Sequence, residues 1–286
     1  MKNLLPPPWI KFPQISPFSI GWRMGAGEGY KFKFNDWLKS LSQDERREYQ
    51  QLFAEPATWL GYWDERLGDD ESTLFTYNDF VLDLWEREPR YDLAWLKKRY
   101  NAGVAGKFLL FWGHQKGASI SASCLSQWYA ASFWEDEVRY ACAEQYMMAK
   151  KAECFGDKEA LEQILSAKDP AQMKALGRQV RGFDAKVWDE IKFSVVLNAS
   201  YLKFSQNAKL REFLLSTKDK ILVEASPVDK IWGIGLAASD ENAHNPMKWR
   251  GQNLLGFALM RARDEIAKVY KNVHLCDENE LNLDHL

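Results

Sequence analysis

The stretch that decides the fold runs from residue 142 to residue 155 and reads CAEQYMMAKKAECF. Apolar side chains recur in it at helical spacing, which predicts a helix from Ala141 to Phe155. Glu144 and Lys151 fall on one stripe of that helix together with large apolar groups. Burial raises the pKa of a carboxyl group and a nearby Lys lowers it, which is how proteins tune a general acid or base. A solvated helix face has the same spacing, so both interpretations stay open.

Helical patterns continue on the C-terminal side of this stretch. Asp157 and Asp169 are typical N-caps, and Pro170 suits the first position of a helix. Helices are predicted over residues 157–167, 170–180, 188–204, 207–216 and 252–270. Short strands are predicted over residues 107–112 and 221–225. The predicted fold class is therefore mainly α with a small β component, a compact helical domain preceded by an α-rich extension.

The first hundred residues have a different pattern. The prolines at positions 6–8, 13 and 17 predict an extended segment to about Pro17. Gly25–Gly29 predicts a turn, and helices are predicted over residues 35–53 and 79–100. The small residues at 102–106 mark a boundary. We therefore divide the chain into an extension of unknown role (1–105), a catalytic domain (106–270) and a polar C-terminal tail (271–286).

Charge and composition exclude several classes of protein. The chain has 286 residues, with 38 Lys and Arg against 40 Asp and Glu, and a formal net charge of -2. This balance excludes adhesion of the whole chain to nucleic acid and leaves room only for a local basic groove. Apolar runs are far shorter than the roughly 18 residues that span a bilayer, so we expect no membrane contact. Pro6–Pro8 interrupt the start before a signal-peptide core, and we expect a cytoplasmic protein.

The aromatic content leaves two interpretations open. The chain carries 13 Trp, 11 Tyr and 16 Phe, which form either a heavily packed core or stacking platforms for flat ligands. The four cysteines contain no CxxC pair and have the spacing of neither a zinc site nor a disulfide framework. The chain also lacks the GxSxG, HExxH and Walker motifs, which weighs against triad and zinc hydrolases.

A second constellation lies between residues 230 and 256. Gly233 and Gly235 allow a close approach of the backbone, and a polar loop with Asp240 follows. Arg250, Gln252 and Asn253 stand where the last predicted helix begins. A helix N-terminus beside an Arg is a natural anion site, and an N-cap beside a stacked Trp fits the same residues equally well. One His near two adjacent carboxylates is a poor ligand set, so we expect no metal.

Several blocks of the sequence together resemble the NADAR family, also called YbiA-like. They are LSQWY (125–129), CAEQYMMAKKA (142–152), ALGR (175–178), VRGFD (180–184), KFSQN (203–207), LVEASP (222–227), IWGIGL (231–236) and WRGQNLLG (249–256). The resemblance runs in order from about Phe108 to Arg263 and leaves the first hundred residues outside. It implies a compact, mainly helical domain that hydrolyses the N-glycosidic bond between ribose and a nitrogen base, without a cofactor.

The resemblance implies two substrate classes with the same bond chemistry. One is ADP-ribose attached to guanine in nucleic acid, which we favour because the Trp, Arg and Asn residues suit a large aromatic ligand with phosphates. The other is a ribosyl-phosphate substrate, a phosphoribosylamino-pyrimidine intermediate of riboflavin biosynthesis. A module that binds ADP-ribose or a nucleotide without turning it over is the alternative outside enzymology.

The resemblance also assigns the chemistry to particular residues. Cleavage of an N-ribosyl bond passes through an oxocarbenium-like transition state, which needs a carboxylate and a proton donor. Glu144 is the first candidate for the carboxylate and Asp240 the second. Lys151 is a candidate donor to the leaving group, or a nucleophile toward the opened sugar aldehyde. The expected substrate-binding residues are Gln127, Trp128, Trp232, Gly233, Arg250, Gln252 and Asn253, with the two Trp stacking on a base and Arg250 and Asn253 holding phosphate or ribose hydroxyls.

Overall fold

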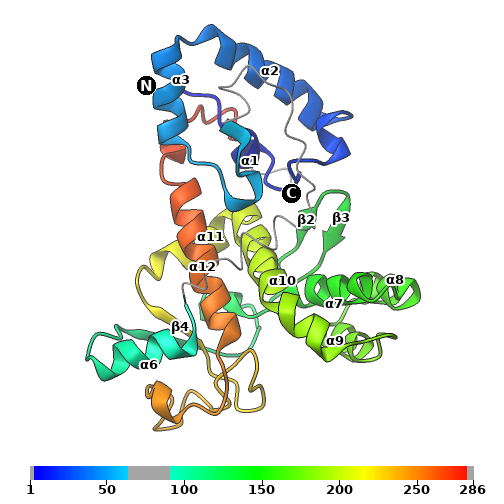
Figure 1. Cartoon of the computed structure of the whole chain (residues 1–286), viewed down its shortest axis with the longest axis vertical. Coiled ribbons are helices and arrows are strands. Elements are labelled where there is room, and N and C mark those ends of the chain that lie inside the picture. Colours follow the sequence, from blue (N-terminus) through cyan, green and yellow to red (C-terminus); the bar gives the residue numbers. More distant parts are fainter. Residues whose placement is uncertain (1–2, 64–90, 282–286) are drawn as a thin grey trace.

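Helices dominate the structure, a computed structural model that describes residues 3–63 and 91–281 (Figure 1). The helices are α1 (Pro8–Lys11), α2 (Ala26–Ser40), α3 (Gln43–Leu52), α6 (Leu93–Asn101), α7 (Ala143–Cys154), α8 (Lys158–Ser166), α9 (Pro170–Arg178), α10 (Ala185–Gln206), α11 (Ala208–Ser216) and α12 (Leu254–Val269). The strands are β1 (Phe108–Phe111), β2 (Phe133–Glu135), β3 (Val138–Tyr140) and β4 (Ile221–Glu224). The predicted class, mainly α with a small β component, is confirmed.

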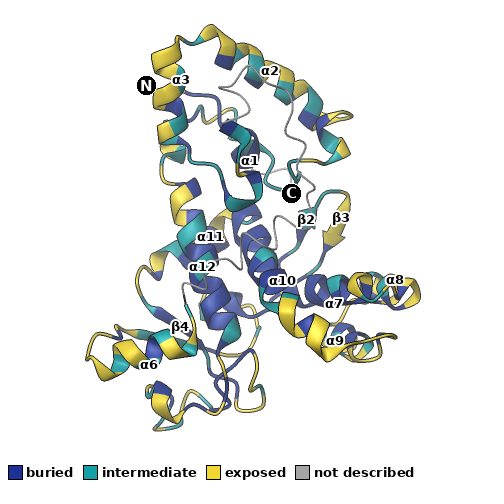
Figure 2. Ribbon diagram, in the orientation of Figure 1, coloured by how far each residue is buried: buried dark blue, intermediate teal, exposed yellow. Residues whose placement is uncertain are grey.

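Two long helices, α10 and α12, form the centre of the molecule and are buried along most of their length (Figure 2). α12 packs against β4, and Gly256 allows this approach because a Cβ there would collide with the Leu222 carbonyl oxygen. β4 pairs in parallel with β1, with Glu224 opposite Phe111 at the last position. α7 packs on α10, and α8 and α9 pack on α7. The two parallel strands therefore end together at one edge of the core.

The predicted elements from residue 107 onward are confirmed to within a few residues at their ends. The side chain of Asp157 caps α8 by accepting from the Ala160 N–H, and that of Asp169 caps α9 by accepting from the Gln172 N–H. The β2–β3 hairpin was not predicted, because strands of three residues carry no recognisable alternation. Of the helix predicted over residues 79–100, only the part from residue 91 lies within the described residues, where α6 begins at Leu93.

Three predictions for the N-terminal region are wrong. The segment to Pro17 contains one helical turn, α1, because Pro8 stands at its first position, where a missing N–H is tolerated. Residues 25–29 are not a turn, since α2 already begins at Ala26. The single helix predicted over residues 35–53 is two helices, because Ser42 and Glu45 form a capping box that starts α3.

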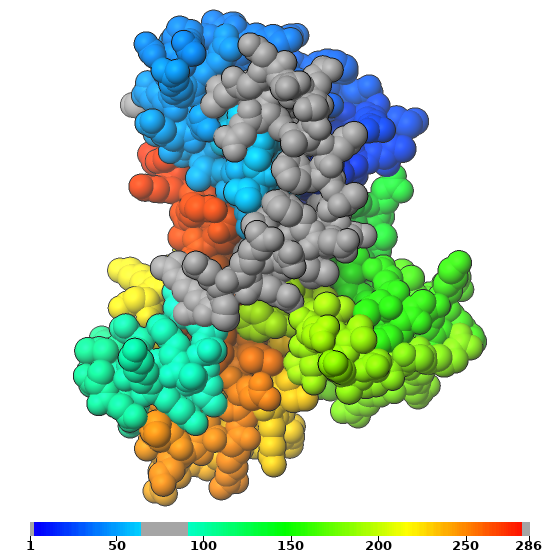
Figure 3. Space-filling model, viewed as in Figure 1, coloured from blue at the N-terminus to red at the C-terminus, as the bar shows by residue number. Residues whose placement is uncertain are grey.

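The N-terminal helices lie at one end of the molecule, and α6 and the α7–α9 group project to opposite sides of the other end (Figure 3). The C-terminal segment returns to this N-terminal end. The Leu4 N–H donates to Leu275 O at 3.1 Å, and the Asp277 N–H donates to Leu4 O at 2.9 Å. The division into residues 1–105, 106–270 and 271–286 stays a prediction. Within the described ranges, no helix combines the length and the apolar character needed to cross a membrane.

Candidate active site

A cavity of about 570 Å³ opens at the carboxyl ends of the parallel strands β1 and β4. Sites of α/β sheets lie at the same edge, because several chain segments leave the strands there and spread apart. The lining residues come from the ends of both strands, from the loop before Tyr129 and from α9. They are Trp112, Gly113, His114, Ser126, Trp128, Ala171, Lys174, Ala175, Arg178, Glu224, Ser226, Val228 and Asp229.

Two indole rings belong to the lining of this cavity. Trp112 directly follows β1 and is 61% exposed, an unusual state for so large an apolar side chain. Trp128 is half-buried, and its ring centroid lies 5.5 Å from that of His114. Its backbone N–H donates to Ser126 Oγ at 3.2 Å, which fixes the local turn. Both rings are placed where a flat ligand can stack on them.

One wall of the cavity is positively charged. Lys174 and Arg178 lie one turn apart on α9, and Ala171 and Ala175 leave space between them. The Lys174 Nζ is 3.8 Å from the Asp229 carboxylate and 5.8 Å from the Trp128 ring centroid. A planar guanidinium and a mobile ammonium on one helix face are typical of a site that binds phosphate.

Glu144 lies in the first turn of α7 and is only 2% exposed. Its backbone N–H donates to Gln127 O at 3.0 Å, while its Oε1 has no hydrogen-bond partner among the described residues. Burial raises the pKa of this carboxyl group to about 7, against the lowering effect of Lys174 and of a hydrogen bond with Trp128. Glu144 is therefore a buried carboxyl group behind the cavity lining, of which it is not a member, and the cavity residues Lys174, Asp229 and Arg178 lie near enough to influence its pKa.

Glu224 is the last residue of β4 and lines the cavity directly. Its Oε2 is buried and has no partner within residues 3–63 and 91–281. Burial, followed by the negative charges of Asp229 and Glu144, raises the pKa of this carboxyl group to about 8, against the lowering effect of Lys174. The two carboxyl groups therefore disfavour each other's ionisation, which is the arrangement that separates an acid from a base.

The loop after β4 holds Asp229 in a fixed position. The Asp229 carboxylate accepts from the backbone N–H groups of Ile231 at 2.9 Å and Trp232 at 2.8 Å. The chain then returns to β4, where the Ile234 N–H donates to Glu224 O at 2.9 Å. A Cβ at Gly233 would lie 2.9 Å from Glu224 O, so only glycine fits this close approach. The close backbone approach expected at Gly233 is present, and its role in binding substrate stays a prediction.

Asn253 lies away from the cavity wall and supports Glu224 from behind. Its backbone is left-handed, with φ at +57°, and its side chain is fully buried. Oδ1 accepts from the Glu224 N–H at 3.0 Å, and Nδ2 donates to Leu222 O at 2.9 Å. Both polar groups of the amide are therefore engaged with β4, which leaves the side chain unsuited to the predicted contact with ribose or phosphate.

The other residues expected from the sequence are distributed over several places. Lys151 donates to Gly177 O at 2.7 Å, lies 3.9 Å from the Phe183 ring centroid and is not a lining residue of the cavity. Asp240 accepts from the Asn242 N–H at 2.8 Å in its own loop. Arg250 and Gln252 are exposed outside the cavity lining. The structure thus brings Glu144, Gln127 and Trp128 together, whereas Trp232 is buried in the Asp229 loop.

Four charged residues of the cavity were not among the expected site residues: Lys174, Arg178, Glu224 and Asp229. Glu224 does carry a signal, since a carboxylate directly after a buried apolar strand marks a strand end near a site. Lys174 and Arg178 also have a recognisable sequence signal, because two cationic residues one helical turn apart flank small residues on the same face. In the described part of the chain, no three His, Cys, Asp or Glu side chains gather as a metal site.

Comparison with known proteins identifies the family of the chain. A family model described as the NADAR domain matches residues 110–267. An N-glycosidase of Acanthamoeba polyphaga mimivirus is 43% identical over 164 residues, covering 56% of this chain and 96% of that protein. The chloroplastic riboflavin biosynthesis protein PYRR of Zea mays is 33% identical over 138 residues, covering 46% of this chain and 20% of that protein. The NMR structure of Escherichia coli YbiA is 28% identical with a TM-score of 0.46, covering 56% of this chain and 85% of that one. The chain belongs to the NADAR domain family.

Proposed function

We propose that this protein is an N-glycosidase that hydrolyses the bond between ribose and a nitrogen base in the cavity at the ends of β1 and β4. The observation that carries the proposal is the pair of carboxyl groups, Glu144 and Glu224, whose pKa values burial raises to about 7 and about 8. Carboxyl groups with strongly raised pKa values beside a cavity are typical of sites of acid–base catalysis. The relative from mimivirus, which is named an N-glycosidase, supports the same activity.

Glu144 is the base of the proposed reaction. As the bond to the nitrogen base lengthens, positive charge develops on the ribose ring, and the Glu144 carboxylate stabilises it. The same carboxylate then accepts a proton from the water that attacks the anomeric carbon. With a pKa of about 7, this group is ionised in a large fraction of molecules at neutral pH.

Glu224 is the acid of the proposed reaction. With a pKa of about 8, it is mostly protonated at neutral pH and donates its proton to the departing nitrogen. Water supplies the hydroxyl of the free sugar, and its proton stays on Glu144, so the two groups exchange their protonation states in one turnover. Exchange of protons with solvent restores the starting state.

The remaining lining residues fit the substrate that we favour, ADP-ribose attached to guanine in nucleic acid. Lys174 and Arg178 provide positive charge for the phosphates, and Trp112 and Trp128 provide faces for flat rings. The exposed position of Trp112 leaves the mouth open to a substrate that is part of a larger polymer. The roles expected for Lys151, Asp240, Trp232, Arg250, Gln252 and Asn253 stay predictions.

A second candidate is an N-glycosidase that acts on phosphoribosylamino-pyrimidine intermediates. The similarity to the riboflavin biosynthesis protein of Zea mays supports this candidate. Its substrate needs the same carboxyl pair and one phosphate contact. A module that binds ADP-ribose without turnover is the third candidate. It keeps Lys174 and Trp128 but does not depend on Glu144 or Glu224.

Mass spectrometry of reaction products separates the three candidates. Purified protein is incubated without added metal with ADP-ribosylated guanine DNA in one tube and with a phosphoribosylamino-pyrimidine in another. Glu144→Gln and Glu224→Gln are run beside the wild type, with the exposed α8 variant Glu162→Gln as the matched control. We expect the wild type and the control to release ADP-ribose from DNA and the Glu144→Gln protein to be inactive. Release of ribose phosphate alone supports the second candidate, and binding of ADP-ribose without turnover supports the third. A fully active Glu144→Gln protein removes the assignment of the base.

A further inference from the structure

Lys203 is a buried lysine of α10 that is only 1% exposed. Its Nζ donates to Cys124 O at 2.6 Å and to Ser126 O at 2.8 Å. The ammonium also lies 5.5 Å from the Tyr129 ring centroid and 5.2 Å from that of Phe204. No carboxylate of the described residues forms an ion pair with it.

A lysine in this position is unfavourable for stability alone. Moving an ammonium group into the interior carries a large desolvation penalty, and an apolar side chain of the same volume avoids that penalty. Burial accordingly lowers the pKa of Lys203 to about 8, while the nearest titratable groups, the Cys124 and Cys142 thiols, are held neutral because burial raises their pKa values. What the ammonium group contributes to the structure is therefore its pair of hydrogen bonds to the Cys124 and Ser126 carbonyl groups.

The segment that Lys203 holds leads directly to the cavity. Ser126 and Trp128 are lining residues, and Ser126 O is one of the two acceptors of the Lys203 ammonium. The next carbonyl, Gln127 O, accepts the Glu144 N–H at 3.0 Å. The Gln127 side chain is itself buried, and its Oε1 lacks a partner among the residues described. Lys203 of α10 therefore holds the Cys124 and Ser126 carbonyl groups, and the adjacent Gln127 carbonyl group binds the first turn of α7 at Glu144.

We propose that Lys203 is a positioning residue that clamps the Cys124 and Ser126 carbonyls, and thereby sets the Trp128 ring and the Glu144 carboxylate at the cavity. This proposal rests on the proposed function, because it assigns Glu144 and Trp128 to the reaction. Lys203 is not itself a lining residue of the cavity, and it contacts the lining only through the Ser126 carbonyl group.

Three variants test the clamp by kinetics. Lys203→Met keeps the apolar volume but removes both donors, Lys203→Arg keeps a cation with donors, and Lys192→Met removes another lysine of α10, one that pairs with Asp189. We expect kcat of Lys203→Met to fall by roughly 10- to 100-fold, with a smaller change in KM, because two buried carbonyl groups lose their partner and the loop shifts. Lys203→Arg recovers part of the loss, and Lys192→Met behaves as the wild type.

Hydrogen exchange of the free protein tests the clamp without any substrate. We expect the amides of Ser126, Tyr129 and Glu144 to exchange at least tenfold faster in Lys203→Met than in Lys192→Met, while amides of α12 stay equally protected. Since no turnover is needed, this result stands or falls separately from the N-glycosidase assignment. Wild-type protection of the three amides in Lys203→Met overturns the clamp, as does a lowered melting temperature with unchanged kcat, which is the result for a residue that only packs the core. If Lys203→Met does not fold, the same comparison is made with Lys203→Gln, which keeps one donor.

Discussion

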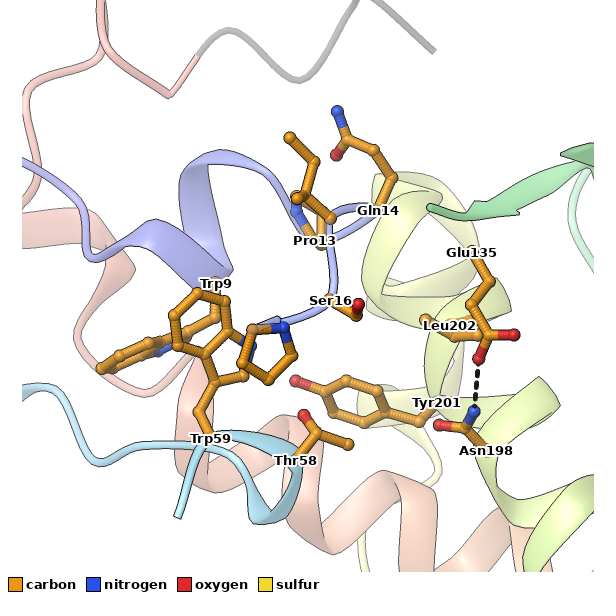
Figure 4. Close-up of a pocket in the computed structure, with 12 residues that line it drawn as sticks. Trp9, Pro13, Gln14, Ser16, Thr58, Trp59, Glu135, Asn198, Tyr201 and Leu202 are labelled. Atoms are coloured by element: carbon orange, nitrogen blue, oxygen red, sulfur yellow. Dashed lines mark hydrogen bonds between the residues drawn. The ribbon is translucent and has the colours of Figure 1, made fainter. Parts of the chain in front are cut away.

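Aromatic side chains are packed differently in the N-terminal region and in the cavity at the ends of β1 and β4. In the N-terminal region the rings pack on one another: the Trp9 ring centroid lies 5.4 Å from those of Trp59 and Trp63. Figure 4 shows Trp9 and Trp59 near Tyr201, and the pocket that these rings line together with neighbouring residues has a volume of only about 30 Å³. At the cavity, Trp112 is 61% exposed, and the half-buried Trp128 lies beside the Lys174 ammonium.

Buried polar groups of the N-terminal region are paired at several positions, although Trp9 Nε1 and Gln14 Oε1 have no partner among the described residues. The buried Tyr49 hydroxyl donates to Leu5 O at 2.6 Å, and the Trp63 indole N–H donates to Phe53 O at 3.0 Å. Glu144 Oε1 and Glu224 Oε2 are equally buried but have no such partner in the described residues. A satisfied buried group stabilises a fold, whereas an unsatisfied ionisable group is available for chemistry. The difference predicts that variants in the two regions affect different quantities.

The largest expected effect on turnover is that of Glu144→Gln. Replacing the carboxylate by an amide keeps its size but removes the charge that stabilises the ribosyl cation and accepts the proton from water. We expect kcat to fall by about 1000-fold, with little change in substrate affinity. Product release followed by mass spectrometry measures the rate, and Glu162→Gln serves as the control. A loss below about threefold would falsify the role of Glu144.

The largest expected effect on stability lies in the N-terminal region. Trp9→Ala removes a ring that is 2% exposed and packed against three other aromatic rings, so we expect unfolding to become easier by about 3–5 kcal/mol. Well below the melting temperature, kcat of the folded protein should match the wild type. Chemical denaturation measures the free energy of unfolding, and kinetics at low temperature measure kcat. A lower kcat in fully folded Trp9→Ala protein would contradict the separation of the two regions.

A smaller effect is expected for the positive wall of the cavity. Lys174→Met keeps the length of the side chain but removes the ammonium that faces the cavity. We expect KM of a phosphate-bearing substrate to rise about tenfold while kcat changes less, because the charge binds ground state and transition state alike. Arg250→Gln, outside the cavity lining, is the comparison variant. An equal rise of KM in both variants contradicts the position assigned to the phosphates.

The pH dependence of turnover separates the two carboxyl groups. Glu144 acts as the carboxylate, so activity rises as pH increases through about 7, and Glu224 acts as the acid, so activity falls as pH increases through about 8. Glu224→Gln should lose the alkaline limb of the profile and keep the acidic one. If the alkaline limb of the pH profile persists in Glu224→Gln, the proton donor to the leaving base is another group.

The smallest effect is a pH-dependent gain in stability of Glu144→Gln. The pKa of Glu144 is raised from 4.5 to about 7 in the folded protein, so the folded state binds this proton more tightly than the unfolded state. The stabilising contribution of the neutral form is complete below pH 4.5 and is lost as pH rises through about 7. Glu144→Gln keeps a neutral side chain, and its melting temperature should exceed that of the wild type at pH 8 but not at pH 4.5. Equal differences at both pH values would contradict the raised pKa.

The sequence predicted what is local. The helices α7 to α10 were recognisable from their periodicity and from the caps Asp157 and Asp169, and Glu144 and Trp128 stood in family blocks. The places of Lys174 and Glu224 follow from the packing of α9 on α7 and of α12 on β4, which no local pattern encodes. Asn253 was expected at a ligand, but its left-handed backbone turns the amide toward β4. α2 begins among glycines because Gly27 approaches the Gly21 carbonyl closely, a tertiary cause that overrides helix propensity.

The most direct test of the central claim is a carbon-13 NMR titration of the glutamate carboxyl groups, with Glu144→Gln and Glu224→Gln assigning the two signals. The claim is that the cavity is a catalytic site because Glu224 in its lining and the buried Glu144 behind the lining both have pKa values near neutral pH. The structure predicts titration midpoints of about 7 for Glu144 and about 8 for Glu224. Midpoints of both groups near the ordinary glutamate value of about 4.3 would contradict it.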